Sequence, residues 1–257
     1  MAERKRKALL AGESWVSAAT HIKGFDQFST VTYHLGAEPL VAALSDSPFD
    51  LRYLPAHEAQ RDFPQSLAAL SDYQVVILSD IGANTLLLHP DTWIHGRRTP
   101  NRLKLIKAYV EAGGGLMMVG GYYSFQGING GARYRGTPVE EALPVEILPY
   151  DDRIEVPEGF TPVLKQKGHP IFDGLDGPWP DLLGFNEVKA KPGAEVLATA
   201  SAEYGEKPLL VAGAFGKGRT LAWTSDIGPH WLPNDFAAWP GYGRLWRQAL
   251  EWLVGAR

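Results

Sequence analysis

Short apolar runs recur along the first half of the chain and predict buried strands. Three of them are apolar almost throughout, as in strands covered on both faces: residues 7–12, 74–79 and 115–119. Residues 49–54 alternate between apolar and polar side chains and predict a fourth strand.

Helical spacing of apolar residues fills the intervals between these runs. It predicts helices over residues 31–44 and 66–70, and a third helix that starts at Thr99-Pro100 and stops at Gly113. Thr99 offers an N-cap hydroxyl, and Pro100 suits the first helical turn. Buried strands that alternate with helices predict a doubly wound α/β fold, in which helices cover both faces of a mostly parallel sheet.

The second half of the chain begins irregularly and then predicts further strands. Residues 122–149 are rich in Gly and Pro and contain a predicted short helix at 139–143. The later predictions are strands at 153–156 and 187–197, a β-hairpin of 208–215 and 219–224 around Gly216-Lys217-Gly218, and a final helix at 241–254. We expect one domain over residues 1–257, with 1–6 as a basic tail and the later strands extending the same sheet.

Composition removes several kinds of chemistry. None of the 257 residues is a cysteine, which excludes disulfides, iron–sulfur clusters, thiolate zinc sites and a cysteine nucleophile. The net charge of −4 gives no electrostatic reason to expect nucleic acid or an anionic membrane as a partner. The apolar stretch at residues 8–11 is too short for a signal peptide, and no run suits a membrane span, so we expect a cytoplasmic protein.

Polar and aromatic side chains follow the carboxyl ends of four predicted strands. In chain order they are Glu13; Asp80; Tyr122, Tyr123, Ser124 and Gln126; and Asp226, His230 and Trp231. Ligands of open α/β sheets bind beyond these ends, so we expect the four groups to converge and bind a small molecule. Two structural alternatives stay open: Glu13 could cap a helix, and Asp80 could bond loop amides.

Residues 13–28 read as a long polar and aromatic loop. A loop of this length is unusual for a simple connector, so His21, Lys23 and Asp26 join the candidate ligand-binding residues.

Metal and phosphate motifs are weak in this sequence. The Asp and His candidates lack His-x-x-x-His or Asp-x-Asp spacing, and the glycines at 127–131 and 216–218 lack the strand and helix context of phosphate loops. We therefore predict no metal and no cofactor.

The segment 115–126, GLMMVGGYYSFQ, resembles the nucleophile elbow of class I glutamine amidotransferases. That elbow reads Gly-x-Cys-x-Gly-x-Gln; Gly120 and Gln126 match it, whereas Tyr122 stands at the cysteine position and Ser124 at the second glycine. The chain most resembles the "putative glutamine amidotransferase" branch and is similar to trehalose-utilization-like (ThuA-like) proteins. The supporting fragments are GESW at 12–15, HIKGFDQF at 21–28, RYRGTPVEEALPVEI at 133–147, SDIGPHW at 225–231, and a tail with FGKGR, TSD and an aromatic helix.

The resemblance implies a flavodoxin-like fold with a C-terminal β-hairpin and terminal helix, but its catalytic residues do not carry over. Members of the family use a Cys–His–Glu arrangement, with His and Glu in an H-x-E motif near the C-terminus. Here His230 is followed by Trp231-Leu232, and no thiol exists. Ser124 lies two residues past the elbow apex, and the Tyr122 phenol needs strong activation, so we predict no catalytic residue and no glutaminase activity.

Three functional hypotheses remain. The first is a catalytically degenerate protein, a pseudoenzyme, that binds small molecules such as carbohydrates or acts as an interaction module. Its rim would present acids beside the aromatic residues Trp15, Tyr122, Tyr123, Phe125, Trp231 and Trp239. The alternative is a hydrolase that uses Glu13 or Asp80 with Asp226 on a glycoside or related metabolite. A third is a homo-oligomer held by exposed aromatics. Whether the chain is an enzyme stays open.

Overall fold

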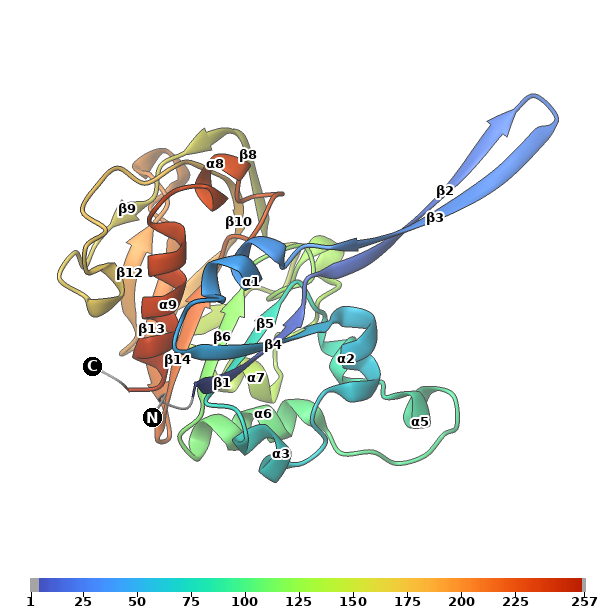
Figure 1. Cartoon of the computed structure of the whole chain (residues 1–257), viewed down its shortest axis with the longest axis horizontal. Helices are drawn as coiled ribbons and strands as arrows, with labels where there is room; N and C mark the ends of the chain where they lie inside the picture. The colour runs from blue at the N-terminus through green and yellow to red at the C-terminus, as the bar shows by residue number, and fades with distance from the viewer. Residues whose placement is uncertain (1–4, 256–257) are drawn as a thin grey trace.

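The computed structural model describes residues 5–255, and its centre is an eight-stranded sheet (Figure 1). In spatial order the strands are β4 (Phe49–Pro55), β1 (Arg6–Gly12), β5 (Val75–Ser79), β6 (Gly115–Val119), β14 (Gly218–Trp223), β13 (Pro208–Phe215), β12 (Glu195–Thr199) and β9 (Val163–Leu164). The first five are parallel, and the last three continue the sheet antiparallel. The predicted α/β fold with a mostly parallel sheet is therefore correct.

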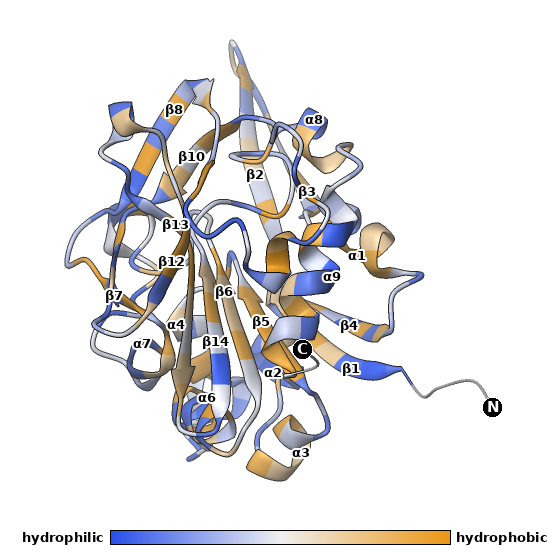
Figure 2. Cartoon of the chain, turned by 90° about the vertical axis from the view of Figure 1, so that its left-hand side faces the viewer, coloured by the Kyte–Doolittle hydropathy of each residue, from blue (hydrophilic) through white to orange (hydrophobic). Residues whose placement is uncertain are grey.

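Strand β1 shows why the sheet has a hydrophobic core on each face. Ala8 and Leu10 belong to one core and Leu9 and Ala11 to the other, because successive strand side chains point to opposite faces. The hydrophobic colouring of the central strands in Figure 2 follows this burial. The first core is covered by α1 (Glu38–Leu44) and α9 (Tyr242–Leu253); the second is covered by α2 (Ala56–Asp62), α3 (Leu67–Ser71), α4 (Ala83–Leu87), α6 (Arg102–Glu111) and α7 (Pro138–Ala142).

Smaller elements surround the sheet. Two antiparallel ribbons lie outside it, one of β8 (Arg153–Phe160) with β10 (Leu182–Asn186) and one of β7 (Val145–Ile147) with β11 (Val188–Ala190). The remaining helical segments are α5 (Pro90–Trp93), α8 (Asn234–Ala237) and the 3-10 turns η1 (Ile128–Gly130), η2 (Pro170–Phe172) and η3 (Ala202–Tyr204).

A two-stranded antiparallel ribbon projects from the body, as Figure 1 shows at the upper right. It consists of β2 (Ser14–Lys23) and β3 (Asp26–Leu35), joined at Gly24-Phe25, and residues 14–35 are called the arm below. Every residue from 15 to 33 is exposed to solvent.

The arm overturns two predictions. Residues 13–28 do not form a loop, because residues 14–23 pair with 26–35 along their whole length. The helix predicted over 31–44 is wrong in its first half, since α1 begins only at Glu38. The pattern in this segment fits both elements. Val31 and Leu35 are four residues apart, as on one face of a helix, but Val31, Tyr33 and Leu35 are also two residues apart, as on one face of a strand.

Two element boundaries also differ from their predictions. Helix α6 begins at Arg102 with Asn101 as its cap, whose side chain accepts a hydrogen bond from the Lys104 amide at 3.1 Å, so Thr99 is not the N-cap. The strand predicted over 187–197 is two strands, β11 and β12, separated by a turn in which Gly193 has a φ of +83°. Strands β8 and β11 also pair outside the main sheet, where they were expected to extend it.

None of the helices within residues 5–255 combines the length and the apolar character that crossing a bilayer requires. The predicted basic tail lies largely outside the described residues, which begin at residue 5, and Arg6 already belongs to β1.

Candidate functional site

Four neighbouring parallel strands end at the same edge of the sheet. They are β1, β5, β6 and β14, and the chain continues from their ends to Glu13, Asp80, Tyr122 and Asp226 respectively. Parallel strands place their carboxyl ends together, so residues far apart in the sequence meet here.

These residues surround a pocket of about 360 Å³. Its lining consists of Glu13, Trp15, Gly36, Asp80, Tyr122, Tyr123, Asp226, Gly228, Pro229 and His230. Trp15 is near the start of β2 and Gly36 directly follows β3, so the pocket lies at the base of the arm.

The backbone turns sharply where two of the acids leave their strands. Glu13 has a φ of +48° and Asp80 a φ of +43°, a left-handed conformation that side chains other than glycine rarely adopt. The Asp80 amide donates to the Ser124 hydroxyl at 3.1 Å, and the Asp80 carboxylate accepts from the Tyr123 amide at 2.7 Å. Backbone strain of this kind is concentrated at functional sites in proteins.

Burial raises the pKa of all three pocket carboxyl groups. Glu13 is buried and lies near Asp80 and Asp226, which together hold the Glu13 pKa well above its usual range, although its carboxylate accepts from the Ser79 hydroxyl. Burial raises the pKa of Asp80 to about 6 and also raises that of Asp226. Carboxyl groups that keep their protons toward neutral pH can donate as well as accept hydrogen bonds.

His230 is oriented by Asp226. Its Nδ1 lies 2.9 Å from Asp226 Oδ2, and the same oxygen accepts from the Trp231 amide at 2.9 Å. Burial alone lowers the pKa of His230, but the hydrogen bond and the charge of Asp226 outweigh it, and the pKa is raised. An imidazole held through Nδ1 leaves its other nitrogen for a ligand.

Tyr122 forms a supported aromatic wall of the pocket. Its ring meets the His230 ring edge-on at 4.3 Å between centroids, and the Arg153 guanidinium lies 4.8 Å from its centroid. Trp231 packs against Tyr122 at 5.7 Å, and the Trp231 indole N–H donates to Glu155 at 2.8 Å. The side chain at the elbow is therefore held by packing on several sides.

A buried pair outside the predicted set fixes the elbow loop. Asn186 accepts from the Gly121 amide at 3.0 Å and donates to Asp152 at 2.8 Å. Asp152 also accepts from the amides of Gln126 and Gly127, at 2.8 and 2.9 Å. No sequence motif identifies Asp152 or Asn186 as site residues. Both come from segments outside the main sheet, so the search for polar residues at its strand ends does not find them.

Not every predicted site residue reaches the pocket. His21, Lys23 and Asp26 lie at the far end of the arm, because the segment that carries them is a ribbon rather than a loop folded over the rim. The candidates Ser124, Gln126 and Trp231 lie behind the pocket wall, where Ser124 and Trp231 are buried.

Two aromatic residues expected at the rim belong to the core instead. Phe125 is fully buried, and Trp239 packs against Trp179 and Phe236 with ring centroids 5.2 and 5.7 Å apart. Strand-end position alone does not fix the direction in which a side chain points.

Metal ligation finds no geometric basis in the pocket. Within the part of the chain that the structure describes, no three His, Asp or Glu side chains are grouped closely enough to hold an ion.

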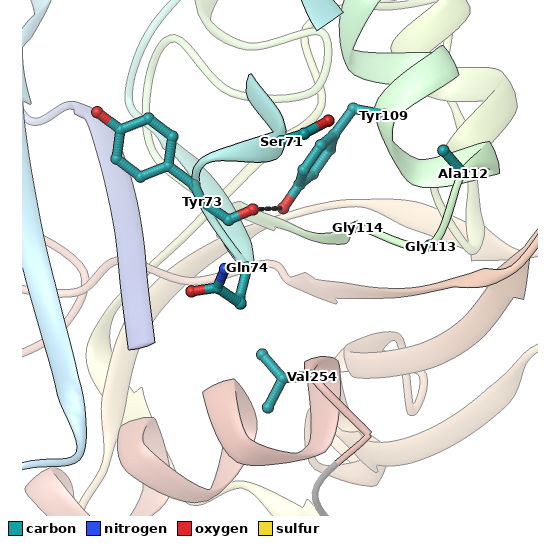
Figure 3. A pocket seen from close by; sticks show the side chains of 8 residues that line it. All are labelled: Ser71, Tyr73, Gln74, Tyr109, Ala112, Gly113, Gly114 and Val254. Carbon is teal, nitrogen blue, oxygen red and sulfur yellow. Dashed lines mark hydrogen bonds between the residues drawn. The ribbon is translucent and has the colours of Figure 1, made fainter. Parts of the chain in front are cut away.

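Other hollows lie away from the strand ends. One of them has a volume of about 260 Å³ and lies at the opposite edge of the sheet, where Gln74 and Gly114 precede β5 and β6. Figure 3 shows the residues that line it. The Tyr109 hydroxyl there donates to the Tyr73 carbonyl at 3.1 Å, which ties α6 to the start of β5. A hollow of about 510 Å³ lies between Thr161 and Trp179, outside the parallel strands.

A family model described as "Putative glutamine amidotransferase" matches residues 7–255. This match covers nearly the whole described chain, the arm included. No curated protein matches the chain.

Two solved structures resemble the chain in sequence and in fold. They are the cytoplasmic proteins STM3548 and STM1381 from Salmonella typhimurium, each 41% identical with a TM-score of 0.91 over 96% of this chain, and over 98% and 99% of their own. Coverage this high leaves about ten of the 257 residues unmatched, so most of the 22-residue arm has a counterpart in both.

A ThuA-like protein from Parabacteroides merdae shares the fold at 18% identity. Its TM-score is 0.55, over 98% of this chain and 91% of its own.

Proposed function

The chain belongs to this glutamine amidotransferase-like family, and we propose that it has no glutaminase activity and instead binds a small polyhydroxylated metabolite, such as a carbohydrate, in the pocket at the base of the arm. Like its two relatives named as cytoplasmic proteins, it is expected in the cytoplasm.

The loss of glutaminase activity follows from the residue at the elbow. Glutaminases of this family attack the amide with a thiolate, and the chain contains no cysteine. Tyr122 occupies the position of the nucleophile. Burial raises the pKa of its phenol above the ordinary value for tyrosine, which makes the reactive phenolate less accessible. Leu232 stands where the family places the catalytic glutamate.

The juxtaposition of three carboxyl groups, those of Glu13 and Asp226 buried and that of Asp80 partly buried, with exposed aromatic faces carries the binding proposal. Glu13, Asp80 and Asp226 present oxygen atoms to which sugar hydroxyls can bond. Trp15 and Tyr123 line the same pocket and are 45% and 48% exposed, which leaves flat apolar surface for the C–H face of a sugar ring.

The hydrolase alternative has less support. A glycoside hydrolase needs one free carboxyl acid and one free carboxylate. Asp226 Oδ2 already accepts from both His230 and Trp231, which suits a structural role better than proton transfer.

Calorimetry and thermal shift with monosaccharides, disaccharides and polyols test the proposal. At least one compound should bind and raise the melting temperature, and Trp15→Ala should weaken that binding by tenfold or more. Trp93→Ala is the matched control, because Trp93 is 69% exposed and lies outside the pocket. The absence of binding by every polyhydroxylated compound would refute the ligand class. Ammonia release from glutamine above background would refute the loss of activity.

A further inference from the structure

Three carboxyl oxygens of the pocket accept no hydrogen bond from any residue between 5 and 255. They are Oε2 of Glu13, Oδ2 of Asp80 and Oδ1 of Asp226, whereas the other oxygen of each group already accepts a hydrogen bond inside the protein. Glu13 and Asp226 are each only 6% exposed, so bulk water has little access to these two side chains. Buried polar atoms normally have partners, and here the pocket is the space from which a partner can come.

The three acids carry more negative charge than their surroundings balance. The charges of Asp80 and Asp226 both raise the pKa of Glu13, which shows that the groups repel one another when ionised. In the described part of the chain the pocket lining includes no Lys or Arg, and its one histidine, His230, is already paired with Asp226. A cation that enters from solution would remove this repulsion.

The aromatic lining favours an organic cation. Trp15, Tyr122 and Tyr123 line the same pocket as the acids. Gly36 brings one ring close to one acid, because a β-carbon at residue 36 would lie 2.8 Å from Glu13 Oε2 and 3.3 Å from Trp15 Cζ3. Aromatic faces attract ammonium groups, so a cation bound at Glu13 has a second source of stabilisation beside it.

We propose that the ligand of this pocket is an amino sugar or a similar polyhydroxylated amine, and that the free carboxyl oxygens of Glu13, Asp80 and Asp226 hold its ammonium group. A primary ammonium group has three N–H donors, which equals the number of free oxygens. The hydroxyl groups of the ligand are left for the outer ring nitrogen of His230, and its C–H face for Trp15 and Tyr123. This inference rests on the proposed function and narrows its ligand class.

A neutral sugar meets the same requirement less well. Its hydroxyl groups can bond to the free oxygens but bring no charge, so the repulsion among the three acids persists. A hydrogen bond between two charged groups is also stronger than one between a carboxylate and a neutral hydroxyl. The amine should therefore bind more tightly than a hydroxyl compound of the same shape.

Calorimetry near neutral pH with matched sugars tests the inference. Glucosamine, galactosamine and mannosamine are compared with glucose, galactose and mannose, and with the N-acetyl forms, in which the nitrogen carries no charge. At least one amino sugar should bind at least about tenfold more tightly than both of its neutral forms.

The outcomes separate this inference from the proposed function. A neutral sugar that binds as tightly as its amino form would overturn ammonium recognition and leave the proposed function intact. Binding of putrescine, an amine without hydroxyl groups, but of none of the sugars would support ammonium recognition and refute the polyhydroxylated class. Binding of none of these compounds would overturn both.

Glu13→Gln tests whether the charge of the acid is responsible. The amide oxygen can still accept from the Ser79 hydroxyl, but the group no longer carries a charge, so the preference for the amino sugar should fall about tenfold. Glu203→Gln is the matched control, because Glu203 is exposed and lies outside the pocket. Asp80→Asn, whose amide oxygen can still accept from the Tyr123 amide, provides the same test if Glu13→Gln does not fold. A folded variant that keeps the wild-type preference would overturn the inference.

Discussion

The carboxyl groups of Asp80 and Asp226 face each other across Gly121. A β-carbon at residue 121 would lie 2.9 Å from Asp80 Oδ1 and 3.0 Å from Asp226 Oδ1. The φ of Gly121 is +134°, a conformation that only glycine adopts without strain. The missing side chain is thus what lets the two acids share one side of the pocket.

Gly121→Ala should therefore destabilise the protein by about 1–3 kcal/mol and abolish ligand binding, because the methyl group forces the two carboxyl groups apart. Urea unfolding and calorimetry measure the two effects. Gly193→Ala is the control, since Gly193 also has a positive φ but no atom lies within 4 Å of its added β-carbon. If Gly121→Ala binds ligand as wild type does, the carboxyl pair is not part of the binding site.

Asp152 holds the elbow loop in place, and its removal should be costly. Asp152→Ala leaves the amides of Gln126 and Gly127 and the side chain of Asn186 without their acceptor, which should reduce the free energy of unfolding by about 3–5 kcal/mol. Asp151→Ala, which breaks a pair with Arg153 near the surface, should cost about 1 kcal/mol or less. Equal losses in the two variants would contradict the special role of Asp152.

The pKa of His230 should depend on Asp226. Burial of the imidazole lowers this pKa, and the hydrogen bond and charge of Asp226 outweigh that effect, so the His230 pKa should fall in Asp226→Asn. Imidazole NMR shifts followed against pH measure it, with His230→Gln to assign the signal among seven histidines. A smaller fall is expected in Glu155→Gln, because Glu155 acts on His230 without a hydrogen bond. An unchanged His230 pKa in Asp226→Asn would show that the pair does not form in solution.

The buried strands could be predicted because burial on both faces leaves a continuous apolar run, as in residues 115–119. The arm could not, because beyond its contacts at the base, such as that of Tyr33 with His57, its residues are exposed on both faces, so the usual signal of alternating burial was absent. Its Ser, Thr and Ala content is typical of a loop, and Val31 with Leu35 also fits helical spacing.

The strand-end acids were predictable for a topological reason. Glu13 and Asp80 directly follow β1 and β5, and Asp226 comes shortly after β14; these strands belong to the four neighbouring parallel strands β1, β5, β6 and β14. Asp152 and Asn186 reach the elbow from outside the main sheet, and only tertiary packing brings them there. Local sequence contains no information about such contacts.

Stability should fall as the pH rises through the range in which Asp80 titrates. Its pKa is raised by burial from 3.8 to about 6, so the folded protein binds the proton more tightly than the unfolded chain does. The contribution of Asp80 to the free energy of unfolding is then largest below pH 4 and falls between pH 4 and about 6. Above that range this contribution no longer changes with pH. A shift of this size corresponds to roughly 2–3 kcal/mol.

Asp80→Asn should remove much of that pH dependence, since an amide does not titrate and its oxygen can still accept from the Tyr123 amide. The variant should match wild type near pH 4 and exceed it at pH 7.5, measured as the free energy of unfolding in urea. Asp72→Asn, on the exposed surface, should follow the wild-type profile at both pH values. If Asp80→Asn is equally destabilised at pH 4 and pH 7.5, the Asp80 carboxyl group is stabilised by its hydrogen bonds rather than strained by burial.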